Sequence, residues 1–304
     1  MKKSGKANII YDIFLRILFF RWHQMTVWQR RKRLQFFNAL TPLSKEILVE
    51  GFDRFKVPAK KITTRSMVQG TILYLHGGAY VLGMTKNHIN LCSKIAHLVG
   101  MEIIAPHYRL APEDPFPSAL NDVVSVYSDL LLQKGKTSPL FIGGDSAGGG
   151  LALALLQEIR EREFPMPDGA FLFSPWTDLT LSSNSVIEKA RVDPILSSYG
   201  LREDARAYAG NLPLDSPRIS PLFASLHGFP PILIQVGTQE ILLDDARSFA
   251  EKARMAGIDV VLSEWEGMFH VVQTFPMLDA TDAAIKEVAA FIARHKSYTS
   301  RERD

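Results

Sequence analysis

A glycine-rich stretch around one serine constrains the fold more than any other part of the sequence. The segment GGDSAGGG, residues 143–150, places five glycines and an alanine around Ser146. The run SPLFIG before it is typical of a buried strand, and LALALLQEIRER after it has apolar residues at helical spacing. The sequence therefore predicts that Ser146 lies on a sharp turn from a strand into a helix.

The residues of this turn match a pattern that serves nucleophilic catalysis. Gly144, Ser146 and Gly148 form G-x-S-x-G, in which a strained turn makes the serine hydroxyl project from the sheet. Glycines are needed because the strand and helix backbones approach closely there. A phosphate-binding turn is the alternative, but the sequence lacks both glycine patterns typical of nucleotide sites. We therefore interpret Ser146 as a candidate nucleophile.

A second glycine pair follows an earlier strand, in LYLHGGAY. Gly77 and Gly78 would leave backbone N–H groups free to face a substrate oxygen, as in the HGGG-type loop of esterases. Together with the N–H of Ala147 they would form an oxyanion hole, which stabilises the charge that develops during acyl transfer. The alternative is that HGG forms only a tight turn.

The candidate general base comes late in the chain, because this architecture orders its triad as serine, acid, histidine. His270, in WEGMFHVV, follows the strand-like run DVVLSEW and would lie at the carboxyl edge of the sheet. His227 precedes the strand expected to deliver the acid. His295 closes a predicted helix, where it suits the helix dipole. We therefore select His270.

Three carboxylates compete as the triad acid after the strand-like run PPILIQVG. Glu240 comes first on the loop, whereas Asp244 and Asp245 open the next helix and suit its dipole. Glutamate can replace aspartate because the role requires only a carboxylate that orients the imidazole and stabilises its charged form. We predict Glu240, with Asp244 as the alternative.

Alternating strand and helix patterns predict an α/β fold with a mostly parallel sheet flanked by helices. The 304 residues suffice for one large core with an added cap, and 46% hydrophobic with 22% charged residues are typical of a globular protein. The strand-like runs are TILYLHG, MEIIAPHY, SPLFIGG, GAFLFSPW, PPILIQVG and DVVLSEWEG. The helical patterns cover about 87–99, 118–133, 147–161, 243–256 and 281–295.

Two regions break this alternation and predict a helical cap over the strand carboxyl ends. The first is the segment 1–50, followed by a catalytic domain over 51–304 that contains the second, at about 179–218. Near the amino terminus, Asp12 and Arg16 interrupt the apolar run, so we expect neither a signal peptide nor a membrane span. The spacing of Ile10, Phe14, Ile17 and Leu18 predicts that they share one face of a helix. That helix either caps the domain or lies on a membrane surface, helped by the basic cluster at 30–33.

Charge and cysteine content exclude several other classes. A net charge of +3 is too small for a nucleic-acid-binding face. The single cysteine, Cys92, cannot form an internal disulfide, so no oxidising compartment is needed. We expect a cytoplasmic protein, or one associated with a membrane through its amino-terminal helix.

Taken together, HGGAY, YRLAPEDP, GDSAGGG, SPWTDL, GTQEILLDD and GMFH resemble the hormone-sensitive-lipase-like esterases of the α/β-hydrolase superfamily, over residues 70–290. The resemblance implies an α/β-hydrolase fold without metal or organic cofactor, and a homodimer formed through the sheet edge. It implies Ser146 as nucleophile and His270 as base, with Gly77, Gly78 and Ala147 as oxyanion donors. Glu240 stands where most of these esterases have aspartate.

The expected activity is that of a serine carboxylesterase acting through an acyl-enzyme on short to medium acyl esters, with lactones as a further class. The aromatic residues of the segment 1–50 favour an apolar substrate pocket. The alternative from another class is a non-catalytic ligand-binding protein on the same fold. We expect two further groups to have supporting roles: Arg109, Glu113 and Asp122 brace the loop beside the oxyanion strand, and Trp176, Asp178 and Asp193 shape the pocket.

Overall fold

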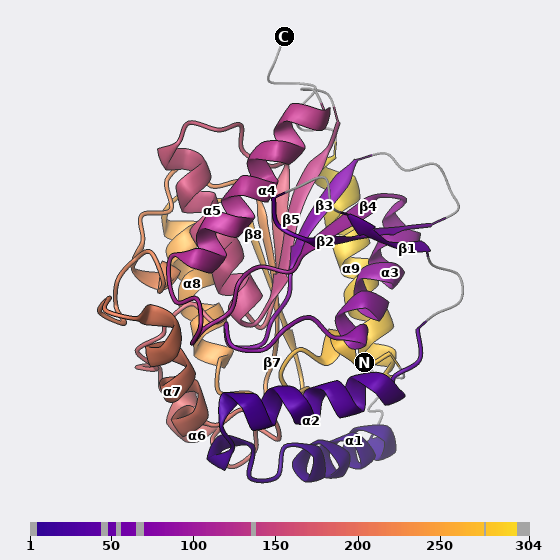
Figure 1. The fold of residues 1–304 in the computed structure, drawn as a ribbon, viewed down its shortest axis with the longest axis vertical. Helices are drawn as coiled ribbons and strands as arrows, with labels where there is room; N and C mark the ends of the chain where they lie inside the picture. Colours follow the sequence, from indigo (N-terminus) through magenta and orange to yellow (C-terminus); the bar gives the residue numbers. More distant parts are fainter. Residues whose placement is uncertain are drawn as a thin grey trace.

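A mostly parallel eight-stranded sheet forms the centre of the molecule (Figure 1). The computed structural model describes residues 5–43, 48–52, 56–64, 70–134, 138–276 and 278–296. The strand order is β1-β2-β4-β3-β5-β6-β7-β8, in which β2 runs antiparallel to both neighbours. The strands are β1 (Leu48–Phe52), β2 (Ala59–Thr63), β3 (Thr71–Leu75), β4 (Glu102–Pro106), β5 (Leu140–Asp145), β6 (Gly169–Phe173), β7 (Ile232–Gly237) and β8 (Val260–Trp265).

The strand order reverses between β3 and β5, which are parallel neighbours. Chain connections leave these two strands in opposite directions across the sheet, so a crevice opens beyond their carboxyl ends, where open α/β sheets bind ligands. The HGG segment follows β3, and Ser146 follows β5. The topology therefore brings the two glycine-rich segments together.

Helices cover both faces of the sheet and bury two apolar clusters. The helices α4 (Ser118–Lys134), α5 (Ala147–Glu161) and α8 (Leu243–Met255) contribute to the larger cluster on one face. The helices α3 (Lys86–Val99) and α9 (Asp279–His295) contribute to the cluster on the other. Cys92 of α3 is buried there, as expected of a small apolar side chain.

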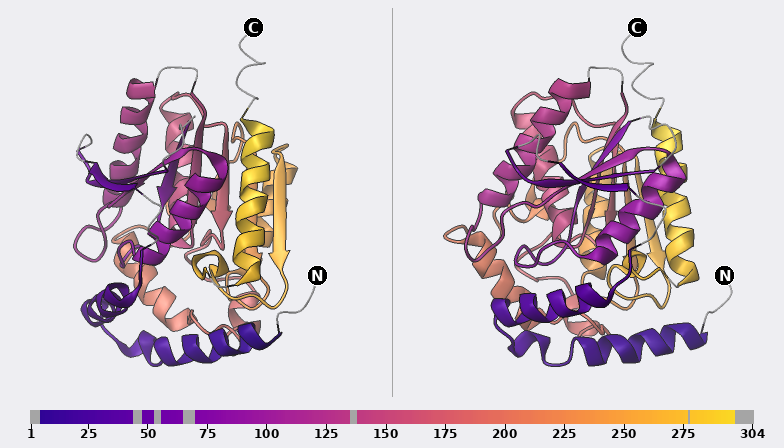
Figure 2. Two further views of the ribbon diagram at one scale, coloured as in Figure 1. Left: turned by 90° about the vertical axis from the view of Figure 1, so that its right-hand side faces the viewer. Right: turned by 45° about the vertical axis from the view of Figure 1, so that its right-hand side comes forward.

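A helical cap lies across the carboxyl ends of the strands, at the end of the molecule opposite the last turn of α9 (Figures 1 and 2). It combines α1 (Gly5–Leu18), η1 (Trp22–Gln24) and α2 (Val27–Leu40) with α6 (Ser185–Glu188) and α7 (Ser198–Ala209). A bidentate ion pair joins α2 to α7, with Arg30 Nη1 and Nη2 at 2.7 and 2.5 Å from the Asp204 oxygens. The chain also contains the short 3₁₀ helices η2 (Pro221–Phe223) and η3 (Val272–Thr274).

The predicted α/β-hydrolase fold is confirmed, and each strand and helix expected from residue 70 onward is present. The two amino-terminal strands were not predicted. Their sequences, LVEGF and AKKIT, are short and partly charged, because β1 is an edge strand and β2 is only partly buried. The boundary expected at residue 50 falls inside β1, and the division into cap and catalytic domain stays a prediction.

The apolar face predicted for α1 is only partly covered by the domain. Phe14 and Leu18 line a cavity beneath the cap, whereas Ile17 is exposed. The fourth residue of that expectation, Ile10, has a side chain outside the described part of the structure. Within the described residues, no helix combines the length and apolar character needed to cross a membrane.

Candidate active site

Ser146 occupies a strained turn between β5 and α5. Its φ of 53° and ψ of −122° are rarely adopted by a residue with a side chain. A Cβ at Gly144 would come 2.5 Å from the Gly148 carbonyl oxygen, and a Cβ at Gly148 would come 2.0 Å from that of Leu75. The turn therefore needs glycine on both sides of Ser146, as the sequence predicted.

Ser146, His270 and Glu240 lie in one hydrogen-bonded row, although 124 residues separate Ser146 from His270. His270 Nε2 lies 2.9 Å from Ser146 Oγ, and His270 Nδ1 lies 2.5 Å from Glu240 Oε2. All three side chains are buried. Because the carboxylate accepts the Nδ1 proton, Nε2 is left unprotonated and faces the serine hydroxyl, the tautomer that a general base requires.

The carboxylate that contacts His270 is that of Glu240 and not that of Asp244. The second oxygen of Glu240, Oε1, accepts hydrogen bonds from Ser174 Oγ and the Gly237 N–H, both at 2.7 Å. Asp244 instead accepts from the Ser185 N–H at 2.9 Å and pairs with Arg247. The helix-opening role considered for Asp244 thus directs its side chain away from His270.

Sequence reasoning did not find Ser174, which connects the acid and base loops. Its hydroxyl donates to Glu240 and accepts from the Val271 N–H at 3.2 Å, next to His270. Ser174 also has a positive φ of 46°. A serine in the segment SPW carries no signal of this role, since both of its partners come from distant parts of the chain.

The surroundings of His270 favour its charged form. Burial alone would lower the pKa of His270, but the adjacent Glu240 carboxylate outweighs it, and the pKa is raised above its ordinary value. Asp193 and Asp145 act in the same direction at longer range. This environment stabilises the imidazolium that forms when the histidine accepts a proton.

The glycines after β3 present backbone N–H groups beside Ser146. Gly77 and Gly78 line the same cavity as Ser146 and His270. Within the described residues, no hydrogen-bond acceptor is found for the N–H of Gly77, Gly78 or Ala147. Gly78 has a φ of +124°, where a side chain would be strained, and the next two residues also have positive φ. The loop therefore adopts an uncommon backbone conformation, and these N–H groups have no acceptor among the described residues.

A partly buried network beside this loop, at the wall of the cavity, fixes its position. The Thr85 N–H donates to His88 Nδ1 at 3.0 Å, so His88 carries its proton on Nε2, which lies 3.4 Å from Asp145 Oδ2. Tyr74 donates to the other oxygen of Asp145 at 2.8 Å. A Cβ on Gly77 would come 2.2 Å from Asp145 Oδ2. The carboxylate next to Ser146 thus packs directly against the loop that carries the free N–H groups.

Ionic contacts brace the following segment, as expected. Arg109 pairs with Asp122 through its Nη2 at 2.7 Å, and Asp122 also accepts the Arg109 N–H at 2.8 Å. Glu113 pairs with Arg31 of α2, which links this segment to the cap.

A cavity of about 580 Å³ opens between the site and the cap. Its walls are mostly apolar, with Leu18, Phe19, Trp22, Leu34, Phe37, Ile195 and Leu196 among the lining residues. None of Trp176, Asp178 and Asp193, which were predicted to shape the pocket, lines the cavity directly. Asp193 acts one step away: its carboxylate accepts from the Ile195 and Leu196 N–H groups, both at 2.9 Å, and thereby holds two lining residues.

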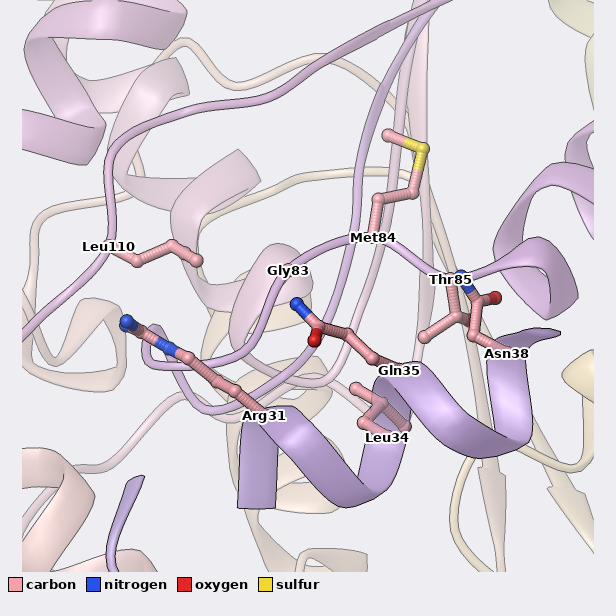
Figure 3. Close-up of a pocket in the computed structure, with 8 residues that line it drawn as sticks. All are labelled: Arg31, Leu34, Gln35, Asn38, Gly83, Met84, Thr85 and Leu110. Atoms are coloured by element: carbon pink, nitrogen blue, oxygen red, sulfur yellow. The ribbon is translucent and has the colours of Figure 1, made fainter. Parts of the chain in front are cut away.

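A smaller groove of about 240 Å³ adjoins this cavity (Figure 3). Side chains of α2 reach from one side toward the segment Gly83 to Thr85. Leu34, Asn38, Gly83 and Thr85 line both spaces, whereas Ser146 and His270 line only the larger one. The groove is a side extension of the main cavity and contains none of the reactive residues.

Comparisons with known proteins agree with this geometry. Residues 72–274 match the family described as alpha/beta hydrolase fold. An acetyl-hydrolase from Streptomyces hygroscopicus is 40% identical over 73% of this chain and 75% of its own length. The chain belongs to the α/β hydrolases. An esterase from Acinetobacter venetianus is 38% identical, with 78% of each chain covered.

Solved structures place the chain within one branch of this family. The crystal structure of an esterase from the bacterial hormone-sensitive lipase family has a TM-score of 0.89 and 34% identity, covering 97% of this chain and 100% of that one. A mutant of the esterase E40 gives a TM-score of 0.90 with the same identity and coverage. The chain is a hormone-sensitive-lipase-like member of the α/β hydrolases and a carboxylic ester hydrolase.

Proposed function

We propose that the protein is a serine carboxylesterase that hydrolyses short to medium acyl esters through an acyl-enzyme. The observation that carries this proposal is the row Ser146 Oγ, His270 and Glu240, with spacings of 2.9 and 2.5 Å. The row lies beside free backbone N–H groups at the floor of an apolar cavity. Nucleophile, base, orienting acid and anion donors are the parts that acyl transfer requires.

In the first half-reaction, Ser146 Oγ attacks the ester carbonyl while His270 Nε2 takes its proton. The N–H groups of Gly77, Gly78 and Ala147 donate to the resulting oxyanion, whose charge also lies near the amino-terminal dipole of α5. His270 then gives the proton to the departing alkoxide, which leaves as the alcohol and generates the acyl-enzyme.

In the second half-reaction, water attacks the acyl carbon while His270 removes a proton from it. The tetrahedral intermediate collapses, the Ser146 oxygen recovers its proton from His270, and the carboxylic acid leaves. Glu240 keeps the imidazole oriented and stabilises its charged form in both steps.

The substrate range follows from the cavity and the relatives. A mostly apolar space of about 580 Å³ suits small and medium esters, including aryl esters and lactones. One relative is named an acetyl-hydrolase, which supports the short end of this range. We expect turnover of p-nitrophenyl esters to fall with the longest acyl chains.

The test measures the turnover of p-nitrophenyl esters of increasing acyl-chain length by the wild type and by Ser146→Ala. The substitution should leave the fold intact and reduce kcat on p-nitrophenyl esters by about 10⁵-fold or more, because nucleophile and base act as a unit. Circular dichroism serves as the folding control. A folded Ser146→Ala protein with wild-type turnover contradicts the proposal, and wild-type binding of esters without turnover favours the non-catalytic alternative.

A further inference from the structure

Helix α1 carries apolar side chains on two opposite faces. One face includes the buried Leu15 and the cavity-lining Leu18. On the other, Ile13 and Ile17, with Phe20 in the turn that follows, are 54%, 67% and 63% exposed. Their spacing of four and three residues places them on one side of the helix. A surface helix normally presents polar residues there, so this exposed face requires an explanation.

Helix α2 also carries large apolar side chains at its exposed surface. Trp28 and Phe36 are 60% and 62% exposed, and Lys32, also exposed, lies midway between them at four-residue spacing. Aromatic side chains on a helix surface are typical of helices that lie in a membrane interface, and a lysine between them can keep its charge among the headgroups while its alkyl stem contacts the apolar region. Both helices lie at the same end of the molecule, although they run in different directions (Figures 1 and 2). The term cap face is used here for Ile13, Ile17, Phe20, Trp28, Lys32 and Phe36.

Charge is divided unequally between residues 1–43, which include the cap helices α1 and α2, and the rest of the chain, called the body here. Residues 1–43 hold nine Lys and Arg and one acidic residue, a net charge of +8, whereas the remaining residues hold 26 basic and 31 acidic ones, a net charge of −5. The Arg30 and Arg31 side chains are engaged in ion pairs with Asp204 and Glu113. Arg21 and Lys32 remain at the exposed surface of this basic segment. An overall charge of +3 therefore conceals a basic cap on an acidic body.

We propose that the cap face docks on an anionic lipid bilayer surface. Its apolar side chains would enter the interface while the positive cap faces the anionic headgroups and the negative body points away. Phe14 and Leu40, which are exposed on the same two helices, also line the active-site cavity. Docking would thus bring the cavity lining next to lipid, where apolar esters concentrate. Lipid binding requires no turnover, so this proposal is tested independently of the proposed function.

The experiment is co-sedimentation of the full chain with phosphatidylcholine vesicles that contain or lack phosphatidylglycerol. The wild type should bind the anionic vesicles, with lower affinity at high salt. The triple variant I13S/I17S/F20S should bind at least about tenfold more weakly, because each apolar group removed from the interface loses transfer free energy. Lys32→Glu should lose about tenfold on anionic vesicles only.

The matched control is L98S/L132S/M255S, which changes three side chains that are 46%, 82% and 83% exposed on α3, α4 and α8, outside the cap. It should bind vesicles as the wild type does, and both triple variants should keep wild-type hydrolysis of a water-soluble ester. Absence of wild-type binding, or equal loss in both triple variants, overturns the proposal. So does sedimentation equilibrium showing that I13S/I17S/F20S converts a dimer to a monomer, because a second copy then covers the cap face.

Discussion

Glu240 and His270 form the contact on which the proposed chemistry depends most directly. The carboxylate raises the pKa of the imidazole, and the reaction requires its neutral form. A raised pKa means that the base becomes available only at higher pH, so the acidic limb of kcat/KM should lie above the ordinary histidine value of about 6.5. Glu240→Gln should move this limb to lower pH and reduce kcat by about 10³ to 10⁴-fold.

A pH profile of kcat/KM for both proteins checks this prediction. Asp244→Asn is the matched control, since Asp244 pairs with Ser185 and Arg247 instead of His270. Its profile should follow the wild type. Loss of turnover in the Asp244 variant alone would assign the acid role to that residue instead.

His88 is expected to position the oxyanion loop through Asp145. In His88→Gln, the amide oxygen can still accept the Thr85 N–H, because glutamine suits this third position of a helix capping box. The same side chain cannot also reach Asp145. Small displacement of the N–H donors affects the transition state more than the bound ester, so we expect kcat to fall about tenfold with little change in KM.

Steady-state kinetics of His88→Gln measure this effect, and His97→Gln serves as the matched control. His97 is exposed in the last turn of the same helix, so its variant should retain wild-type parameters. An unchanged kcat in folded His88→Gln would show that the contact with Asp145 has no part in positioning the donors.

At the scale of elements, the ion pair between α2 and α7 holds the two parts of the cap together. Arg30 and Asp204 are 6% and 3% exposed, and burial raises the pKa of Asp204 even though Arg30 opposes this. Arg30→Met leaves a buried carboxylate without its partner, which should lower the free energy of unfolding by about 3–5 kcal/mol. Urea unfolding measures the loss.

Arg206→Met on α7 provides the comparison. Arg206 forms an exposed pair with Glu203, and exposed pairs contribute only about 0–1 kcal/mol. Equal stability losses in the Arg30 and Arg206 variants would mean that the buried pair does not hold the cap.

For the whole molecule, helices α1 and α2 of the cap should unfold before the sheet. Among the described side chains of α1 and α2, only Leu15 and Arg30 are buried, whereas β3 and β5 are buried along their full length. Segments with little buried surface open at lower free energy than the core. Hydrolytic activity should therefore be lost at a lower urea concentration than the far-UV circular dichroism signal, and coincident transitions would contradict this order.

The amino-acid sequence by itself determined the local part of the site. Strand, turn and helix around Ser146 follow from short-range sterics, since only glycine fits where the backbones of β5, α5 and β3 nearly touch. The same reasoning found the HGG loop and the alternating pattern from residue 70 onward. It also ranked Glu240 on the loop above Asp244 at the start of the next helix, but a separation of four residues could not decide between them.

Only the tertiary structure decided which distant groups meet. Ser174 joins the loops of Glu240 and His270, and His88 contacts Asp145, through contacts between residues far apart in the chain. The amino-terminal strands β1 and β2 and the exposed apolar face of α1 were also found only in the tertiary structure. The spacing of apolar residues indicates which of them share a face of a helix. Packing in the folded protein decides whether that face turns toward the core or toward solvent.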